Sequence, residues 1–446
     1  MEKSIIYNRF KGCLYGQAVG DALGLGTEGM TDEDMAWKYP HGLQHYSQIF
    51  QDRHRKRWKI GDWTDDTDMM LCIAHAVIEN KGVNFTNIAR YFKAWAEGEP
   101  MGIGENTYKV LNIADYVEKP FVVSRMVWEM SRYQSAANGG VMRTSVVGLF
   151  PNHVKECAEN ICKLTHYDPR CIGSCVIVSN LIHALVYGSQ VQNYQEMIDT
   201  AMEYDERIAD YIELAWNETD ITKLMNDDHM GYTLVTLSVA LWAYWHASSF
   251  EDGLLAVVNA GGDADTNAAV ACAILGAKFG FKSIPQEYVE DLIYRDQLDD
   301  AVEGLWHICN MRQDKQHKGT GQTGLVFRLF YQVANGLNLI ARHTGLAYNE
   351  INVLAYYLFM PLTWAVLLDI GLKLPLATPI LIIAWLSIWI TKKKHFESWC
   401  DKVFDKSVQF LLFFKRIGWV YELSSVIICV VLPLLMYVAL IVNIIC

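Results

Sequence analysis

The stretch Gly61-Asp62-Trp63-Thr64-Asp65-Asp66-Thr67-Asp68 and a second stretch, Gly261-Gly262-Asp263-Ala264-Asp265-Thr266, carry the strongest signal in this chain of 446 residues. Each places aspartates in a glycine-containing turn directly before a long apolar segment. From two such turns, side-chain oxygens that are far apart in sequence can converge on a hard cation, which prefers oxygen ligands. The two stretches therefore predict helices that begin beside one composite metal site.

The chemistry of these side chains supports that interpretation. The carboxylates of the predicted site belong to Asp65, Asp66, Asp263 and Asp265. They cannot lie together unneutralised, because like charges at close range raise their pKa values and destabilise the fold. Hydroxyl oxygens on Thr64 and Thr266, with no Cys or His in either stretch, favour Mg²⁺, Mn²⁺ or Ca²⁺ over Zn²⁺. The alternative is that these residues only cap the following helices; two stretches of one design favour the metal.

The first three hundred residues predict an all-α domain. Apolar residues recur there at three- and four-residue spacing, and period-two strands are nearly absent. The predicted helices include 68–79, 85–97, 122–135, 154–164, 172–187, 232–247, 250–260 and 267–279. Glycine-containing stretches at 20–29, 61–64, 102–104, 138–140 and 261–262 are interpreted as breaks between helices. We expect these loops to gather on one face of a domain spanning residues 1–311.

The last hundred residues have a different character. Hydrophobic residues make up 52% of the chain and charged residues only 20%, and the excess lies beyond about Val353. A bilayer core about 30 Å thick needs roughly 20 helical residues. The segments 353–372, 375–391 and 423–446 fit that length within the usual tolerance, so the sequence predicts a membrane domain over 353–446; an unusually apolar soluble helical domain is the alternative. A polar linker is expected at 312–322, followed by an amphipathic helix at 323–352 that lies on the membrane surface or packs on the front domain.

Charge distribution predicts how this chain is oriented. Between the second and third spans lie Lys392, Lys393, Lys394, Lys402, Lys406, Lys415 and Arg416. Such an excess of basic residues is typical of cytoplasmic segments, and the two preceding crossings put the N-terminal domain on the same side. No apolar signal-peptide region follows Met1, and the eleven cysteines form no CxxC pair, which agrees with a reducing compartment. The net charge of −12 argues against a nucleic-acid partner, and the basic stretch 53–57 is interpreted as a solvated loop.

A series of motifs resembles one known family. The motifs are Gly20-Asp21-Ala22-Leu23-Gly24 followed by Glu28, then Trp63-Thr64-Asp65-Asp66-Thr67, Asn138-Gly139-Gly140-Val141-Met142-Arg143, Thr165-His166-Tyr167-Asp168-Pro169 and Gly261-Gly262-Asp263-Ala264-Asp265-Thr266. In order and spacing, over residues 5–310, the series is similar to that of the ADP-ribosylglycohydrolase family. One such motif alone would be weak support, whereas the whole series is specific.

The resemblance implies an all-α hydrolase with two Mg²⁺ ions, replaceable by Mn²⁺, that cleaves the N- or O-glycosidic bond between ADP-ribose and a protein side chain. At the matching positions, the implied metal ligands are Thr64, Asp65, Asp66, Asp263, Asp265 and Thr266. Glu28, Asp65 and Asp66 are the implied catalytic residues. A carboxylate such as Glu28 serves as base towards water or as acid towards the leaving group, depending on its pKa.

The substrate is expected along three loops. Gly102, Ile103, Gly104, Asn106 and Thr107 open a helix whose N–H groups can hold the diphosphate, although a plain capped turn explains them equally well. Asn138, Gly139 and Gly140 allow close backbone approach to a nucleotide, with Arg143 supporting the loop. His166 lines the site or, alternatively, only ties its own loop to a backbone carbonyl.

One position departs from the family pattern. Many relatives have an aspartate where this chain has Gly102, which puts specificity for an arginine-linked substrate in doubt. Glu97 and Glu99 are the nearby acidic residues that can compensate. The expected partners are an ADP-ribosylated protein or a small ADP-ribosyl compound, together with the membrane. Alternatives are a catalytically weak ADP-ribose sensor and a toxin-blocking immunity protein; the oligomeric state and the biological target stay open.

Overall fold

The computed structural model describes residues 2–191, 193–225, 230–318, 346–414 and 421–445, with a few more between 329 and 344. It forms two compact units, Met1–Asp314 and Lys315–Cys446. Among the described residues, helices make up the regular structure, and Ala137 and Tyr232 form an isolated bridge. The predicted all-α fold is confirmed.

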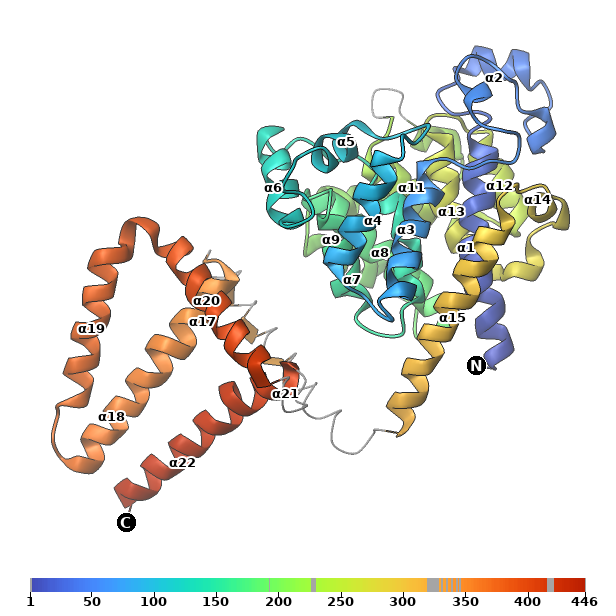
Figure 1. Ribbon diagram of the computed structural model, residues 1–446. Coiled ribbons are helices and arrows are strands. Elements are labelled where there is room, and N and C mark those ends of the chain that lie inside the picture. The colour runs from blue at the N-terminus through green and yellow to red at the C-terminus, as the bar shows by residue number, and fades with distance from the viewer. Residues whose placement is uncertain are drawn as a thin grey trace. The chain divides into compact units, whose positions relative to one another are not determined.

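The first unit is a bundle of helices around one core (Figure 1). Its α-helices are α1 (Lys3–Gly24), α2 (Asp32–Lys38), α3 (Asp65–Glu79), α4 (Phe85–Glu97), α5 (Glu105–Leu111), α6 (Pro120–Met130), α7 (Val154–Lys163), α8 (Pro169–Tyr187), α9 (Tyr194–Met202), α10 (Arg207–Asn217), α11 (Thr233–His246), α12 (Phe250–Val258), α13 (Ala264–Phe279), α14 (Gln286–Glu290) and α15 (Arg295–Lys318). Short 3₁₀ turns join them, at η1 (Tyr46–Gln48), η2 (Arg55–Arg57), η3 (Val141–Arg143), η4 (Ser145–Leu149), η5 (Ile221–Leu224) and η7 (Phe281–Ser283).

The centre of this unit is the contact between α1 and α13. Four glycines on one face of α1, namely Gly12, Gly16, Gly20 and Gly24, face the α13 backbone at Gly276, Cys272, Ala268 and Ala264. A Cβ atom on Gly16 would lie 2.1 Å from the Cys272 carbonyl oxygen, so a side chain is excluded there. The interpretation of residues 20–29 as a break between helices is therefore wrong for 20–24, which lie within α1. These glycines permit close helix packing rather than a turn.

This contact places the two aspartate stretches together. The chain runs along α1 towards Gly24, and α13 begins at Ala264 beside that end, where a Cβ on Gly24 would meet the Ala264 oxygen at 2.4 Å. Helix α3 begins at Asp65 next to the same end, because Asp21 of α1 binds its first turn. The turns before α3 and α13 use glycines with positive φ, at Gly61, Gly261 and Gly262.

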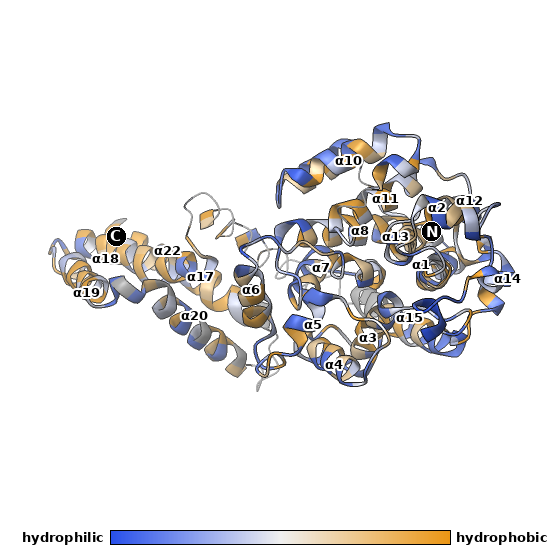
Figure 2. Ribbon diagram, turned by 90° about the horizontal axis from the view of Figure 1, so that it is seen from above, coloured by the Kyte–Doolittle hydropathy of each residue, from blue (hydrophilic) through white to orange (hydrophobic). Residues whose placement is uncertain are grey.

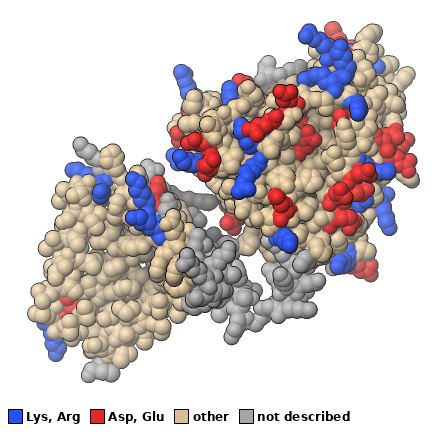
Figure 3. Space-filling model, viewed as in Figure 1, with Lys and Arg blue, Asp and Glu red and all other residues tan. Residues whose placement is uncertain are grey.

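The second unit consists of apolar helices. They are α17 (Tyr348–Val353), the π-helical η8 (Leu354–Phe359), α18 (Met360–Leu372), α19 (Ala377–Lys392), η9 (Lys393–His395), α20 (Phe396–Phe413), α21 (Tyr421–Val426), the π-helical η11 (Ile427–Val431) and α22 (Leu432–Ile445). Helix α18 packs against α19 and α22, and α17 packs against α20. Helices α18, α19 and α22 are mostly orange in Figure 2, whereas α20 also carries blue, hydrophilic residues, and the unit shows few charged side chains in Figure 3.

Length and composition make these helices candidates to cross a membrane. Tyr348–Leu372 and Leu423–Ile444 form continuous apolar helices of 25 and 22 residues. Helix α19 is a shorter apolar helix of 16 residues, about 24 Å long at 1.5 Å per residue. Helix α8 is also long and apolar, but 83% of it is buried in the first unit, so it is a core helix. Three apolar helices thus correspond to the three predicted spans.

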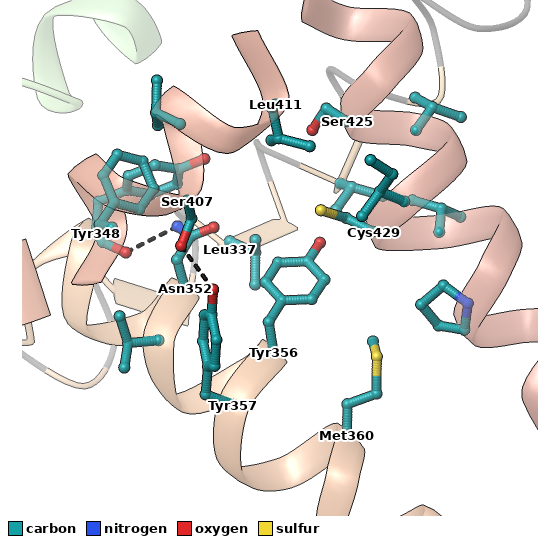
Figure 4. A pocket seen from close by; sticks show the side chains of 18 of the residues that line it. Leu337, Tyr348, Asn352, Tyr356, Tyr357, Met360, Ser407, Leu411, Ser425 and Cys429 are labelled. Carbon is teal, nitrogen blue, oxygen red and sulfur yellow. Dashed lines mark hydrogen bonds between the residues drawn. The ribbon is translucent and has the colours of Figure 1, made fainter. Parts of the chain in front are cut away.

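Parts of the predicted domain plan lie outside the described residues. The expected linker at 312–322 is helical through Lys318, because α15 continues to that residue, and 319–322 are not described. The amphipathic helix expected at 323–352 is described only at scattered residues before α17. Within the second unit, α17, η8, α20, α21 and η11 enclose a pocket of about 250 Å³, where the Tyr357 and Ser407 hydroxyls lie 2.7 Å apart (Figure 4).

Candidate metal centre

Asp21 organises the aspartate stretch at the start of α3. Its side chain is fully buried, and each oxygen accepts two hydrogen bonds. One oxygen accepts from the backbone N–H and hydroxyl of Thr64, at 3.0 and 2.9 Å, and the other accepts from the same groups of Thr67, at 3.0 and 2.6 Å. Burial raises the pKa of Asp21 to about 7 despite these bonds. Asp21 therefore fixes the turn that presents Thr64, Asp65 and Asp66.

Asp66 is the clearest candidate metal ligand. One of its carboxylate oxygens accepts from the Thr64 hydroxyl at 3.0 Å and from the Thr266 hydroxyl at 3.4 Å, so α3 and α13 meet there. The other oxygen, Oδ1, is buried and has no hydrogen-bond partner among the described residues. A buried oxygen without a partner costs free energy, and a cation beside it would remove that cost.

A second group of oxygens comes from Glu28 and from the start of α13. One carboxylate oxygen from each of Glu28, Asp263 and Asp265 lies within 4.8 Å of the other two. Burial and then neighbouring carboxylates raise the pKa of Asp265 well above its ordinary value, and the same two causes act on Asp66. Burial raises the pKa values of Asp65 and Asp263 to about 6. Concentrated, buried negative charge of this kind fits divalent cations with oxygen ligands.

The capping alternative does not explain these side chains. Thr64 and Asp263 are the N-cap residues of α3 and α13, but neither side chain makes a capping hydrogen bond. The Thr64 hydroxyl instead lies between an Asp21 oxygen and an Asp66 oxygen, 2.9 and 3.0 Å away, and Asp263 accepts from the Asn138 amide at 2.5 Å. The oxygens are thus directed towards the site instead of the helix ends.

All these groups line one cavity of about 680 Å³. Its wall includes Glu28 and the six predicted metal ligands, Thr64, Asp65, Asp66, Asp263, Asp265 and Thr266. It also includes eight of the nine predicted substrate-binding residues, namely Gly102, Ile103, Gly104, Asn106, Thr107, Asn138, Gly139 and His166; Gly140 is not on the wall. A Cβ on Gly140 would lie 2.9 Å from the Cys162 sulfur, so this glycine serves packing behind the loop.

Several predicted substrate residues are already engaged by the protein. Asn106 donates to the Thr165 carbonyl at 2.9 Å and accepts from the Ser135 hydroxyl at 3.0 Å, so its side chain ties the helix-opening loop in place. Asn138 likewise holds Asp263. These two side chains hold neighbouring loops of the site in place. Beside them, the backbone of the same loops faces the cavity and is available to a ligand.

His166 is held inside the protein beside the nucleotide loop. Only 2% of it is exposed, and its Nδ1 lies 2.7 Å from the Thr165 hydroxyl. That hydroxyl also accepts from buried Arg143, so Arg143 binds the loop that carries His166. Burial, and then the Arg143 charge, lower the pKa of His166 well below its ordinary value, so the ring is neutral. Its other edge touches Gly139, where a Cβ would lie 2.9 Å from the ring.

The interpretation of residues 53–57 as a solvated loop is wrong for its central residues. Arg55 is only 4% exposed and binds the backbone oxygens of Leu25, Gly26 and Glu28. His54 contacts the Glu28 carboxylate at 2.8 Å. The composition of the stretch gave no sign of this, because a run of basic residues looks the same whether it is solvated or bound to a neighbouring loop.

A smaller cavity of about 210 Å³ adjoins the first. The two share Trp58, Thr64, Asp65, Pro100, Met101 and Gly102. The carboxylates of Asp62, Asp65 and Asp68 line the smaller cavity, as do the rings of Trp58, Trp63 and Tyr294. A Cβ on Gly102 would lie 3.4 Å from an Asp65 carboxylate oxygen and 3.5 Å from Trp58. A larger residue at position 102 would therefore take up space where the two cavities meet.

Comparison with known proteins gives a consistent result. Residues 2–315 match the family model described as ADP-ribosylglycohydrolase. The chain is 29% identical to an uncharacterised protein of Archaeoglobus fulgidus, over 67% of this chain and 96% of that one. It is 24% identical to ADP-ribosylarginine hydrolase Tri1 of Pseudomonas putida, over 67% and 78%, and 25% identical to the ADP-ribosyl-[dinitrogen reductase] glycohydrolase of Rhodospirillum rubrum, over 64% and 91%.

A solved structure supports the fold. An ADP-ribosylglycohydrolase-related protein complex superposes with a TM-score of 0.56 over 69% of this chain and 99% of that one, at 23% sequence identity.

Proposed function

Because the matched region covers most of its length, the chain belongs to the ADP-ribosylglycohydrolase family, and we propose that it is a membrane-anchored, Mg²⁺-dependent hydrolase that removes ADP-ribose from modified protein side chains. The observation that carries the proposal is the unpartnered, buried oxygen of Asp66, a residue that lines one cavity together with the five other predicted carboxylate and hydroxyl ligands. The volume of about 680 Å³ lies within the usual range of ligand sites, roughly 300–1,000 Å³.

The residues divide the chemistry among them. Two Mg²⁺ ions, or Mn²⁺ in their place, would be held by Thr64, Asp65, Asp66, Asp263, Asp265 and Thr266. Bound there, such ions supply Lewis-acid stabilisation and orient oxygen ligands. Glu28 takes a proton from the attacking water, as the cleavage of a ribosyl bond requires. The N–H groups at the start of α5 and the Asn138–Gly139 backbone bind the diphosphate and nucleotide.

The linkage we propose is to arginine. The smaller cavity next to the metal centre offers the Asp62 carboxylate and three aromatic rings, a combination that suits a guanidinium leaving group. Glu97 is directed to Lys93, 3.4 Å away, and the two Asp68 oxygens accept indole N–H bonds from Trp63 and Trp95, so Asp62 is better placed than either to replace the aspartate missing at Gly102. The name of the Pseudomonas putida relative, an ADP-ribosylarginine hydrolase, is consistent with this proposal.

We assign the apolar helices of the second unit as a membrane anchor with the catalytic unit in the cytoplasm. Two of these helices have the length to cross, and α18 packs on the shorter α19. Lys392 ends α19, and lysines at 393, 394, 402 and 406 follow it; basic residues favour the cytoplasmic side.

The experiment is release of ADP-ribose by the full chain in detergent, from arginine-linked and serine-linked substrates, with Mg²⁺ or with chelator. Asp65→Ala and Asp263→Ala test the metal centre, and Asp199→Asn on the exposed surface of α9 is the matched control. Release that requires Mg²⁺ and both aspartates is the expected result. Tight ADP-ribose binding by a folded protein without release from either substrate would instead identify a sensor or a toxin-blocking protein.

A further inference from the structure

Glu28 follows α1 in a short loop at the edge of the cavity, and a separate segment holds both its backbone and its side chain. The Glu28 carbonyl accepts from the buried Arg55 guanidinium, which also binds the Leu25 and Gly26 carbonyls at 2.9 and 3.0 Å. The carboxylate Oε2 of Glu28 lies 2.8 Å from Nε2 of His54. The catalytic carboxylate of the proposed function is therefore tied to the 52–57 segment at two points.

We propose that His54 is a positioning residue for Glu28. Arg57 fixes the His54 tautomer, so that the Nε2–H of His54 donates to Oε2 of Glu28. The other Glu28 oxygen is then left for the attacking water. This inference rests on the proposed function and identifies how its base is oriented. It depends on hydrogen-bond geometry at three side chains.

The tautomer follows from Arg57. Its Nη2 lies 2.6 Å from Nδ1 of His54. A guanidinium only donates hydrogen bonds and stays protonated in proteins, so Nδ1 must be the acceptor. The ring proton then lies on Nε2, which faces the Glu28 carboxylate. A doubly protonated ring would set two N–H groups against each other at Nδ1, so this geometry belongs to the neutral ring.

Arg57 is itself held in place. Its Nε donates to the His54 carbonyl at 3.1 Å, its Nη1 donates to the Met101 carbonyl at 2.9 Å, and its guanidinium lies over the Trp58 ring, 4.5 Å from the centroid. The Met101 carbonyl belongs to the loop that precedes Gly102 in the cavity wall. The chain of contacts from Met101 through Arg57 and His54 to Glu28 thus links the substrate loop to the base.

The remaining Glu28 oxygen has a defined task. Glu28 lines the large cavity, and one of its oxygens lies within 4.8 Å of oxygens of Asp263 and Asp265. With Oε2 engaged by His54, a water that loses a proton in the cavity reaches Oε1. A misplacement of about 1 Å in a catalytic group costs on the order of 100-fold in rate, which sets the scale for losing this contact.

The test compares variants that keep or lose the donor. The side-chain amide of His54→Gln places an N–H near the position of Nε2, whereas that of His54→Asn reaches only as far as Nδ1. We expect His54→Ala and His54→Asn to lower kcat by about 10–100-fold with KM changed less than about 3-fold, and His54→Gln to stay within about 5-fold of wild type. His41→Gln, on an exposed loop, is the matched control.

Equal kcat in the Gln, Asn and Ala variants, whether at the wild-type rate or lowered together, would overturn the positioning role. A second measurement does not depend on activity. Nitrogen-15 spectra of the full chain, labelled at histidine, report which ring nitrogen carries the proton, and the signal that disappears in His54→Gln identifies His54. A Nδ1–H tautomer would overturn the proposal; an Nε2–H tautomer in a protein that releases no ADP-ribose would leave the positioning intact and refute the proposed function instead.

Discussion

Replacing Gly16 by alanine should destabilise the first unit strongly, because this glycine lies where α1 and α13 touch. A Cβ there would lie 2.1 Å from the Cys272 carbonyl oxygen and 2.9 Å from the carbonyl carbon. Since a non-bonded carbon and oxygen need roughly 3.2 Å, the two helices must separate locally by about 1 Å. The obstacle is backbone within a helix, so it cannot move aside as a flexible side chain can.

The magnitude follows from two opposing effects. Inside a helix, alanine is favoured over glycine by about 1 kcal/mol. Overpacking a well-packed core costs typically 1–3 kcal/mol and occasionally more, and here the strain is transmitted along the whole α1–α13 contact. Because the obstacle is helix backbone, we place the overpacking cost above the typical range, at about 4 kcal/mol, which leaves a net loss of about 3 kcal/mol. For a unit of about 310 residues, with an unfolding entropy near 2.1 cal/mol/K per residue, this corresponds to a Tm lower by about 5 °C.

Gly304→Ala in α15 is the matched control. It has the same helix-propensity gain, and the added Cβ meets side-chain atoms of Ile78 alone, Cδ1 at 2.6 Å and the two Cγ atoms at 3.1 and 3.3 Å, so the obstacle is a side chain that can change rotamer and not backbone. The assay is thermal unfolding of the full chain in detergent, following the transition that shifts with Mg²⁺ and ADP-ribose. A Gly16→Ala protein as stable as Gly304→Ala would refute the close backbone contact and, with it, the explanation of how the two aspartate stretches meet.

Three further predictions concern the site. Asp66→Asn should lower ADP-ribose release by at least about 100-fold. It should also raise the Tm measured in chelator and reduce the rise in Tm that Mg²⁺ causes. A rise in Tm with Mg²⁺ equal to that of the wild type would exclude Asp66 as a ligand. Asp62→Asn should raise KM for the arginine-linked substrate by about 5–10-fold, as expected for weakening a charged hydrogen bond, and leave the serine-linked KM unchanged; equal effects on both would contradict the guanidinium site. The stabilisation by Mg²⁺ should increase between pH 4 and pH 7. Burial raises the pKa values of Asp65 and Asp263 to about 6, so the metal-free fold has its full stability below the unfolded-state pKa and loses stability as pH rises through the folded-state pKa. Bound Mg²⁺ offsets this loss, and its effect on Tm therefore grows over the same range. Thermal unfolding in Mg²⁺ and in chelator across this range would measure it, and a constant difference would contradict it.

Within the site, residues differ in how far their roles followed from sequence. The oxygen-bearing residues of the two stretches were identifiable because their chemical type and their place before a helix are local properties. The role of Asp21 could not be identified in this way, although Asp21 lies in a recognised motif. Its four hydrogen bonds go to Thr64 and Thr67, which are more than forty positions away. Asn106 was expected to bind substrate, and its bonds to Thr165 and Ser135, which tie three loops together, were not foreseen.

The helical character of the chain, the oxygen chemistry of its candidate site and the position of its apolar helices could be predicted from the amino-acid sequence, because each depends on the residue types within one short segment. The roles of the glycines of α1 and of the basic residues of η2 became clear only from the folded arrangement. A missing side chain permits either a turn or a close approach of two backbones, and the 2.1 Å spacing at Gly16 shows which. A histidine next to two arginines reads as solvated until Glu28 is found 2.8 Å from its ring. In both cases the deciding partner lies far away in sequence, and the physical interaction exists only once the fold brings the two together.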